Sequence, residues 1–219
     1  MKNIKTNRTE LVFILDRSGS MSGLEKDTIG GYNAMLEKQK REPGEATVTT
    51  VLFDNYVELL HDRIPIQGVA PITEKEYYVR GCTALLDAVG MAIQKISAVQ
   101  QHTAPEMRAE KVLFVITTDG YENASREYSY DKIKALVEEK KAKEGWEFLF
   151  LGANIDAIAT AARFGISADR ATNYHADSQG TAINFAAVSD AASAARCGRP
   201  MEGWKKSIEK DFMSRKSTR

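Results

Sequence analysis

Hydroxyl and carboxylate side chains occur in three short segments that lie far apart in this 219-residue chain. The first segment contains Asp16, Ser18 and Ser20, the second contains Thr83, and the third contains Asp119. Oxygen ligands without sulfur or imidazole suit a hard divalent cation such as Mg²⁺ rather than zinc or copper. The two carboxylates and three hydroxyls therefore predict a metal site.

The predicted elements around these segments explain how they could meet. Asp16 ends a buried strand over residues 10–16, and Asp119 follows a second buried strand over residues 111–117. Thr83 stands at the head of a predicted amphipathic helix. In an extended loop alternate residues point the same way, so the side chains of the first segment can face one point.

Strand and helix patterns alternate along the chain and predict an α/β fold. The predicted strands cover residues 10–16, 46–53, 56–60, 111–117, 146–151 and 171–174. The predicted helices cover residues 23–41, 83–101, 130–144, 156–164 and 178–196. We expect a Rossmann-like, doubly wound, mostly parallel six-stranded sheet in the order 3-2-1-4-5-6, with helices on both faces. The strands ending near Asp16 and Asp119 would be neighbours where the strand order reverses, and ligands bind at such points.

One antiparallel edge strand is expected from a hairpin that turns at Asp54-Asn55. Residues 61–63 are expected to face water at this edge. Residues 64–79 contain Pro65 and Pro71 and are predicted to be mostly connection.

The composition limits the classes of protein to consider. Lys plus Arg and Asp plus Glu number 30 each, which argues against a general nucleic-acid binder. No apolar run reaches the roughly 18 residues that a membrane helix needs, so no membrane span is expected. Residues 1–10 are polar and lack the apolar centre of a signal peptide. The two cysteines, Cys82 and Cys197, have no CxxC spacing. A cytoplasmic protein with reduced thiols is therefore expected.

The C-terminal residues differ from the rest in charge. We expect a main domain over residues 1–198 and a basic tail over residues 199–219. Trp204, Ile208 and Phe212 recur at intervals of four residues, which predicts a short amphipathic helix with a basic face. Docking on the main domain, contact with an acidic partner or membrane surface, and disorder are the alternatives for this tail.

The three polar segments together resemble the metal-ion-dependent adhesion site (MIDAS) of von Willebrand factor type A (vWA) domains. The matching residues are 16–21 (Asp-Arg-Ser-Gly-Ser-Met), 81–88 (Gly-Cys-Thr-Ala-Leu-Leu-Asp-Ala) and 117–120 (Thr-Thr-Asp-Gly). The similarity spans residues 9–173 and fills all five expected positions. The resemblance implies that Ser18, Ser20 and Thr83 bind the metal directly, whereas Asp16 and Asp119 usually act through water.

The resemblance implies that the chain is a metal-dependent protein-protein interaction module. In that family a partner protein often supplies an acidic side chain that completes the metal coordination. Mg²⁺ is the expected ion, with Mn²⁺ and Ca²⁺ as alternatives. The chain resembles the prokaryotic intracellular members of the family rather than secreted adhesins. Its partner and oligomeric state are not encoded in the motif.

Several residues beside the motif are candidates for supporting roles. Arg17, Tyr121, Glu122 and Asn123 are expected to form a partner-binding rim around the metal. Arg17 could attract an acidic partner, and Tyr121 could anchor a contact as exposed aromatics often do. Ordinary solvated-loop roles are the alternative for the loop residues.

Two more carboxylates have structural alternatives. Asp54 is expected to serve the hairpin turn. Asp87 lies one helical turn beyond Thr83, and could either orient a ligand or cap local backbone.

Catalysis is the main competing interpretation. A Mg²⁺-dependent hydrolase or phosphatase could use Asp16 as its nucleophile, but phosphoaspartate enzymes resemble DxDx[TV] in this loop, and here Ser18 replaces the second carboxylate. No general base that could activate a hydroxyl is evident beside Ser18 or Ser20. A scaffold subunit with a vestigial metal site is the third alternative. We expect no enzymatic activity.

Overall fold

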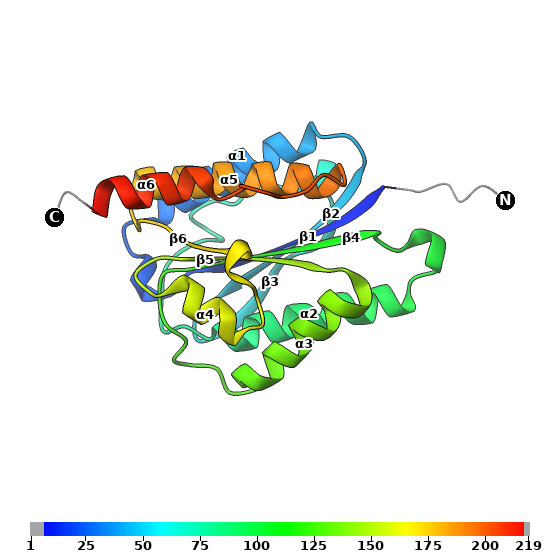
Figure 1. The fold of residues 1–219 in the computed structure, drawn as a ribbon, viewed down its shortest axis with the longest axis horizontal. Helices are drawn as coiled ribbons and strands as arrows, with labels where there is room; N and C mark the ends of the chain where they lie inside the picture. Colours follow the sequence, from blue (N-terminus) through cyan, green and yellow to red (C-terminus); the bar gives the residue numbers. More distant parts are fainter. Residues whose placement is uncertain (1–6, 217–219) are drawn as a thin grey trace.

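One six-stranded sheet lies between two layers of helices (Figure 1). The computed structural model describes residues 7–216. The strands are β1 (Arg8–Asp16), β2 (Glu45–Phe53), β3 (Val57–Pro65), β4 (Lys111–Thr118), β5 (Glu147–Gly152) and β6 (Ala171–Asn173). The helices are α1 (Glu25–Lys40), α2 (Leu85–His102), α3 (Tyr130–Glu144), α4 (Ala157–Arg163), α5 (Ser178–Arg196) and α6 (Lys206–Lys216). Helices α1, α5 and α6 cover one face of the sheet, and α2, α3 and α4 cover the other (Figure 1).

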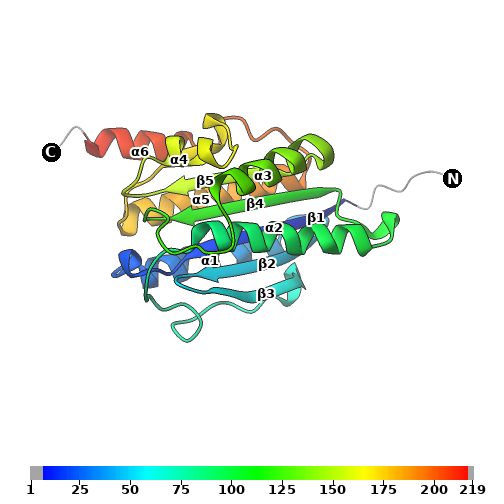
Figure 2. The ribbon, with the colours of Figure 1, turned by 90° about the horizontal axis from the view of Figure 1, so that it is seen from below.

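The strand order is β3-β2-β1-β4-β5-β6, as predicted. Strand β1 pairs in parallel with both β2 and β4, and β5 pairs in parallel with β4 and β6. Only the β2–β3 hairpin is antiparallel among the described strand pairs. Figure 2 shows β1 lying between β2 and β4. The polar segments that follow β1 and β4 are therefore adjacent.

The central strand is buried on both faces, which explains its continuous apolar sequence. Leu11, Phe13 and Leu15 contribute to the core under α1 and α5. Val12 and Ile14 contribute to the core under α2 and α3. This packing fixes the strand and the direction of the loop that leaves its carboxyl end.

Strand β3 differs from the prediction because it continues beyond residue 60 to Pro65. His61, which was expected to face water, is only 7% exposed, and its Nδ1 lies 3.0 Å from Oγ1 of Thr50. The pairing with β2 shifts register on both sides of Thr50, and Arg63 adopts a left-handed backbone with φ of 49°. Such a bulge changes which side chains face inward, so simple alternation fails there.

The C-terminal segment packs on the body of the protein. Met201, Trp204 and Ile208 belong to the same core as β1, and Trp204 Nε1 donates to the carbonyl of Asp169 at 3.0 Å. The Phe212 ring stacks on His175 with ring centroids 4.6 Å apart. The helix expected around these residues is therefore present as α6, and it docks through its apolar face. None of the helices within residues 7–216 combines the length and hydrophobicity that a bilayer span requires.

Candidate metal centre at the carboxyl edge of the sheet

Three loops meet at the carboxyl edge of the parallel strands, and backbone hydrogen bonds join them. The first loop follows β1, the second precedes α2, and the third follows β4. The amide of Gly19 in the first loop donates to the carbonyl of Gly81 in the second at 3.1 Å. The amide of Asn123 in the third loop donates to the carbonyl of Thr83 at 3.1 Å. All five predicted ligand positions are thus held on one connected set of loops.

The hydroxyl and carboxylate oxygens converge. Ser18 Oγ lies 3.0 Å from Ser20 Oγ, which donates to Asp119 Oδ1 at 2.5 Å. A Cβ atom added at Gly120 would lie 3.2 Å from Ser20 Oγ and 3.4 Å from Thr83 Oγ1. The oxygens of the three loops therefore surround a space that a side chain on Gly120 would enter, and this explains why a glycine fits after Asp119.

Asp16 is held rigidly at the base of the site. Its side chain is buried, its Oδ1 accepts from the Ser18 amide at 2.7 Å, and its Oδ2 accepts from Thr118 Oγ1 at 2.6 Å. Burial raises the pKa of Asp16, although these hydrogen bonds oppose the rise. Each carboxylate oxygen has further lone pairs, so Asp16 can still orient a metal-bound water.

Asp119 has an unused oxygen. Its side chain is buried, and among the described residues Oδ2 has no hydrogen-bond partner. Burial raises the pKa of Asp119 to about 6 against the hydrogen bond from Ser20, and the nearby Asp16 carboxylate adds to the rise. A buried carboxylate oxygen without a donor is unfavourable, and a cation is the partner that would relieve both the desolvation and the repulsion.

The donor chemistry fits a hard divalent cation. Within the described residues no three His, Cys, Asp or Glu side chains come together as a metal site, so a cation at this edge would depend on the hydroxyls as well. Two carboxylates with three hydroxyls form an oxygen-only set, which Mg²⁺ and Mn²⁺ accept. The structure brings these five residues together; their binding of a metal stays a prediction.

Tyr121 is one of the two exposed residues among the four predicted rim residues. Its side chain is 58% exposed directly beside the metal loop, although its hydroxyl accepts a long hydrogen bond of 3.4 Å from the Asp156 amide. Tyr121 therefore remains a candidate for partner contact.

Glu122 and Asn123 make internal contacts that shape the site. Glu122 accepts from the Leu86 amide at 2.9 Å and from two amides of its own loop. Asn123 Oδ1 accepts from the Thr83 amide at 2.9 Å. Asp87 accepts from three consecutive amides, those of residues 126–128. These side chains cap the start of α2 and hold the third loop against it, which matches the capping alternative for Asp87.

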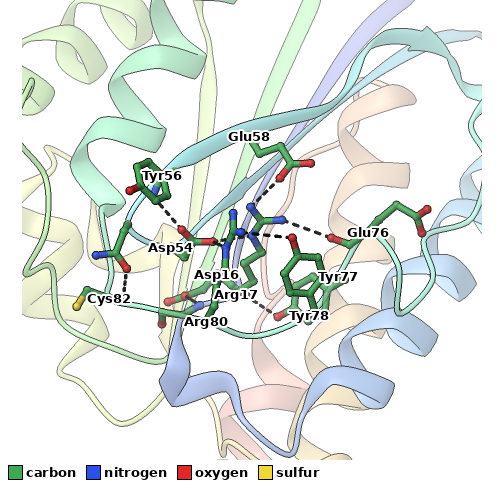
Figure 3. Close-up of polar contacts among 12 residues, drawn as sticks. Asp16, Arg17, Asp54, Tyr56, Glu58, Glu76, Tyr77, Tyr78, Arg80 and Cys82 are labelled. Carbon is green, nitrogen blue, oxygen red and sulfur yellow. Dashed lines mark hydrogen bonds and ion pairs between the residues drawn. The ribbon is translucent and has the colours of Figure 1, made fainter.

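Arg17 does not lie on the rim, contrary to the prediction. Its side chain is completely buried. In Figure 3 it points toward Asp54 and Glu58. Its Nε donates to Asp54 Oδ2 at 2.9 Å, and its Nη2 donates to Glu58 Oε2 at 2.7 Å. The reason is the hairpin, which places two carboxylates where the arginine can be neutralised.

Four contributors were not singled out from the sequence as parts of the site. Thr118 binds Asp16, Gly120 leaves the space between the hydroxyls, and the Tyr77 hydroxyl donates to the Asp16 carbonyl at 2.5 Å (Figure 3). Asp54 contacts two arginines beside the ligand loops. The Thr-Asp-Gly sequence after β4 could have indicated Thr118 and Gly120. No local pattern indicates Tyr77, since 61 residues separate it from Asp16.

Several solved structures have a fold similar to that of this chain. The von Willebrand factor type A protein from Catenulispora acidiphila superposes with a TM-score of 0.57 over 85% of this chain, at 14% identity. The chain has the vWA fold. It covers 43% of that protein, less than half of its length. Neither a protein-family model nor a curated protein sequence matches this chain.

Two further vWA-fold neighbours are described with a bound metal. Proximal thread matrix protein 1 from the mussel byssus, solved with a zinc-occupied MIDAS motif, has a TM-score of 0.57 and 14% identity, and the match covers 85% of this chain and 46% of that one. The manganese-loaded TRAP protein of Plasmodium vivax has a TM-score of 0.55 and 15% identity, with 82% of this chain and 74% of that one covered. At these identities the likeness establishes the fold.

Proposed function

We propose that this vWA-fold chain is a metal-dependent protein-binding module without catalytic turnover. Ser18, Ser20 and Thr83 would hold a divalent cation directly, and Asp16 and Asp119 would balance its charge. A carboxylate from a partner protein would complete the coordination. Mg²⁺ is the ion that we expect, with Mn²⁺ or Ca²⁺ as alternatives.

The observation that carries this proposal is the unpartnered oxygen of Asp119. Oδ2 is buried without a hydrogen-bond partner among the described residues, at the point where hydroxyls from two other loops converge. The zinc and the manganese bound by two vWA-fold neighbours support a divalent cation at the corresponding site of this chain. The bound cation would act as a Lewis acid toward a partner's carboxylate oxygen.

A hydrolase that uses Asp16 as its nucleophile fits the geometry less well. The Asp16 side chain is 1% exposed, and both of its oxygens accept hydrogen bonds. A nucleophile must be able to contact its substrate, and a carboxylate that is 1% exposed is shielded from one. We therefore assign Asp16 an orienting role, and we expect no phosphate release from generic phosphomonoesters with Mg²⁺ or Mn²⁺.

Thermal unfolding with EDTA and then with Mg²⁺, Mn²⁺ or Ca²⁺ tests the metal site. At a metal concentration of 100 times the dissociation constant, wild-type protein should gain about 2.7 kcal/mol, a rise of several degrees in Tm. Asp119→Ala should lose this gain. Asp156→Ala removes an exposed carboxylate that caps α4, so this control should start from a lower Tm and show the same metal-induced rise as wild type. An equal metal response in wild type and Asp119→Ala would contradict the assigned site.

A second measurement tests the partner. With wild-type protein immobilised, binding proteins captured with Mn²⁺ should elute with EDTA, and Asp119→Ala should capture none of them. Substituting the acidic residues of a captured partner should then identify the carboxylate. Capture that is unaffected by EDTA would favour the scaffold alternative with a vestigial metal site. The prokaryotic intracellular type and the cytoplasmic location stay predictions that cell fractionation can check.

A further inference from the structure

Asp54 makes contacts with both loops that carry the hydroxyl ligands. Its Oδ2 accepts from Arg17 Nε at 2.9 Å and from Arg80 Nε at 2.7 Å (Figure 3). Arg17 lies between Asp16 and Ser18 in the first loop, and Arg80 lies three residues before Thr83 in the second. One carboxylate at the tip of the β2–β3 hairpin therefore joins two loops that are more than 60 residues apart in the sequence.

The backbone repeats this connection. The Asp54 carbonyl accepts from the amide of Ala84, next to Thr83, at 2.8 Å. The Arg80 amide donates to the Arg17 carbonyl at 2.9 Å, and the Arg17 amide donates to the Phe53 carbonyl at 2.9 Å. Asn55 Oδ1 accepts from the Cys82 amide at 2.6 Å. The hairpin thus contacts the residues on both sides of Thr83 and the residue that precedes Ser18.

The charges in this cluster balance, and two of the four charged side chains are buried. Two arginines, Arg17 and Arg80, face two carboxylates, Asp54 and Glu58. The side chains of Arg17 and Asp54 are 0% and 1% exposed, and a buried guanidinium is tolerated only when it is paired. The Tyr78 ring lies against both arginines, with the guanidinium carbons 5.4 and 5.3 Å from its centroid. Arg80 is 44% exposed, so it can be changed with less risk to folding.

We infer that Asp54 and Arg80 are positioning residues for the proposed metal site. Through Arg17 and Arg80, Asp54 fixes the spacing between the loop that carries Ser18 and Ser20 and the loop that carries Thr83. The cluster holds the hydroxyls in the geometry that a small hard cation requires, and it does so without adding net charge beside the cation. The expected change in metal affinity rests on the proposed function. The expected change in amide hydrogen exchange depends only on the fold.

The substitution Arg80→Gln separates positioning from simple electrostatics. Removing a positive charge near a cation site would tighten cation binding if charge alone mattered. If Arg80 positions the second loop, its removal should weaken binding despite the favourable change in charge. We expect Mn²⁺ affinity, measured by calorimetry, to fall about tenfold, as for other residues that orient metal ligands. Arg126→Gln, which removes an exposed positive charge from the third loop, is the matched control and should leave the affinity equal or slightly tighter.

Asp54→Asn should act in the same direction and more strongly. The variant loses the charge that neutralises both arginines, so the second loop loosens and the site becomes more positive. We expect Mn²⁺ affinity to fall by about ten- to a hundredfold. Asp62→Asn, which removes the carboxylate that pairs with Lys95 at 2.8 Å on the same hairpin, should bind Mn²⁺ like wild type.

Hydrogen exchange in EDTA provides the test that needs no metal. In Arg80→Gln the amides of Gly19, Arg80 and Ala84 should exchange faster than in wild type. The Gly19 and Arg80 amides join the first loop to the second, and the Ala84 amide joins the second loop to the hairpin. Amides of β5 should exchange as in wild type. Unchanged exchange at the three amides, or equal or tighter Mn²⁺ binding in Arg80→Gln, would overturn the inference. Wild-type protein that fails to bind Mn²⁺ while these amides accelerate in the variant would overturn the proposed function and leave the positioning of the loops supported.

Discussion

At the scale of single residues, the five candidate metal ligands could be selected from the sequence because their pattern is local. Asp16, Ser18 and Ser20 share one loop, and each of the other two positions lies at the end of a recognisable strand or the start of a helix. Arg17 could not be placed in this way. Its direction depends on Asp54 and Glu58, which lie 37 and 41 residues away in the sequence. A side chain next to a ligand in sequence can therefore point away from the ligand site.

Asp119 leads to a prediction about pH in the absence of metal. Its pKa of about 6 in the folded protein exceeds the ordinary value of 3.8, so the folded state binds the proton more tightly than the unfolded state does. Stability from this group is present below pH 3.8 and is lost as the pH rises through 6. In EDTA, Asp119→Asn should be more stable than wild type at pH 7.5 by about 2 kcal/mol, and the difference should vanish near pH 4.

Added metal should reverse this order. At pH 7.5 with Mg²⁺ or Mn²⁺, wild type should gain stability and Asp119→Asn should not. Urea unfolding at the two pH values, with and without EDTA, provides the measurement. A variant that is less stable than wild type in EDTA at pH 7.5 would show that Asp119 is not strained in the metal-free protein.

Gly120 leads to a second prediction at this scale. In Gly120→Ala the added Cβ would lie 3.2 Å from Ser20 Oγ, which must shift by a few tenths of an ångström, and 3.4 Å from Thr83 Oγ1, which is an ordinary contact. We expect Mn²⁺ affinity to fall about tenfold. Gly30→Ala is the matched control, because a Cβ there meets nothing within 4 Å and α1 should gain about 1 kcal/mol at most. Equal affinities in the two variants would place the cation elsewhere.

At the scale of elements, the prediction succeeded where periodicity was continuous and failed where a bulge interrupted it. The sequence patterns were clearest for strands β1, β4 and β5, which are buried along almost their whole length. They were also clear for helices α2 and α5, whose buried residues recur at helical spacing. Strand β3 was predicted too short, because the register shifts beside Thr50 and the left-handed Arg63 break the alternation that marks a half-buried strand. Such irregularities depend on pairing with β2, which a local pattern does not contain.

Helix α6 provides a stability prediction. Ile208 is 2% exposed in the core under α1 and α5, whereas Met213 on the same helix is 69% exposed. Ile208→Ala should lower the free energy of unfolding by about 2–4 kcal/mol, and Met213→Ala should change it by less than about 0.5 kcal/mol. Urea denaturation compares the two. Equal and small effects would mean that α6 contributes little to the fold.

At the scale of the whole molecule, the strand order was predictable from general rules of α/β folds. Alternating strands and helices favour a parallel sheet, and ligands gather where the strand order reverses. In this protein that point lies between β1 and β4, whose trailing loops carry Asp16 and Asp119. Those rules did not predict the support that the β2–β3 hairpin gives to these loops. They describe the order of strands in a sheet, and the contacts of the residues between two strands are a separate matter.

The docking of α6 also determines where this helix ends relative to the three loops of the candidate metal site. This position matters if the protein is attached to a surface. Phe212 stacks on His175, just beyond the carboxyl end of β6, so α6 ends on the side of the sheet that carries the ligand loops. Strand β1 begins on the opposite side (Figure 1). A tether attached ahead of β1 would present the three loops outward to an approaching partner, whereas a tether attached after α6 would bring the support beside them.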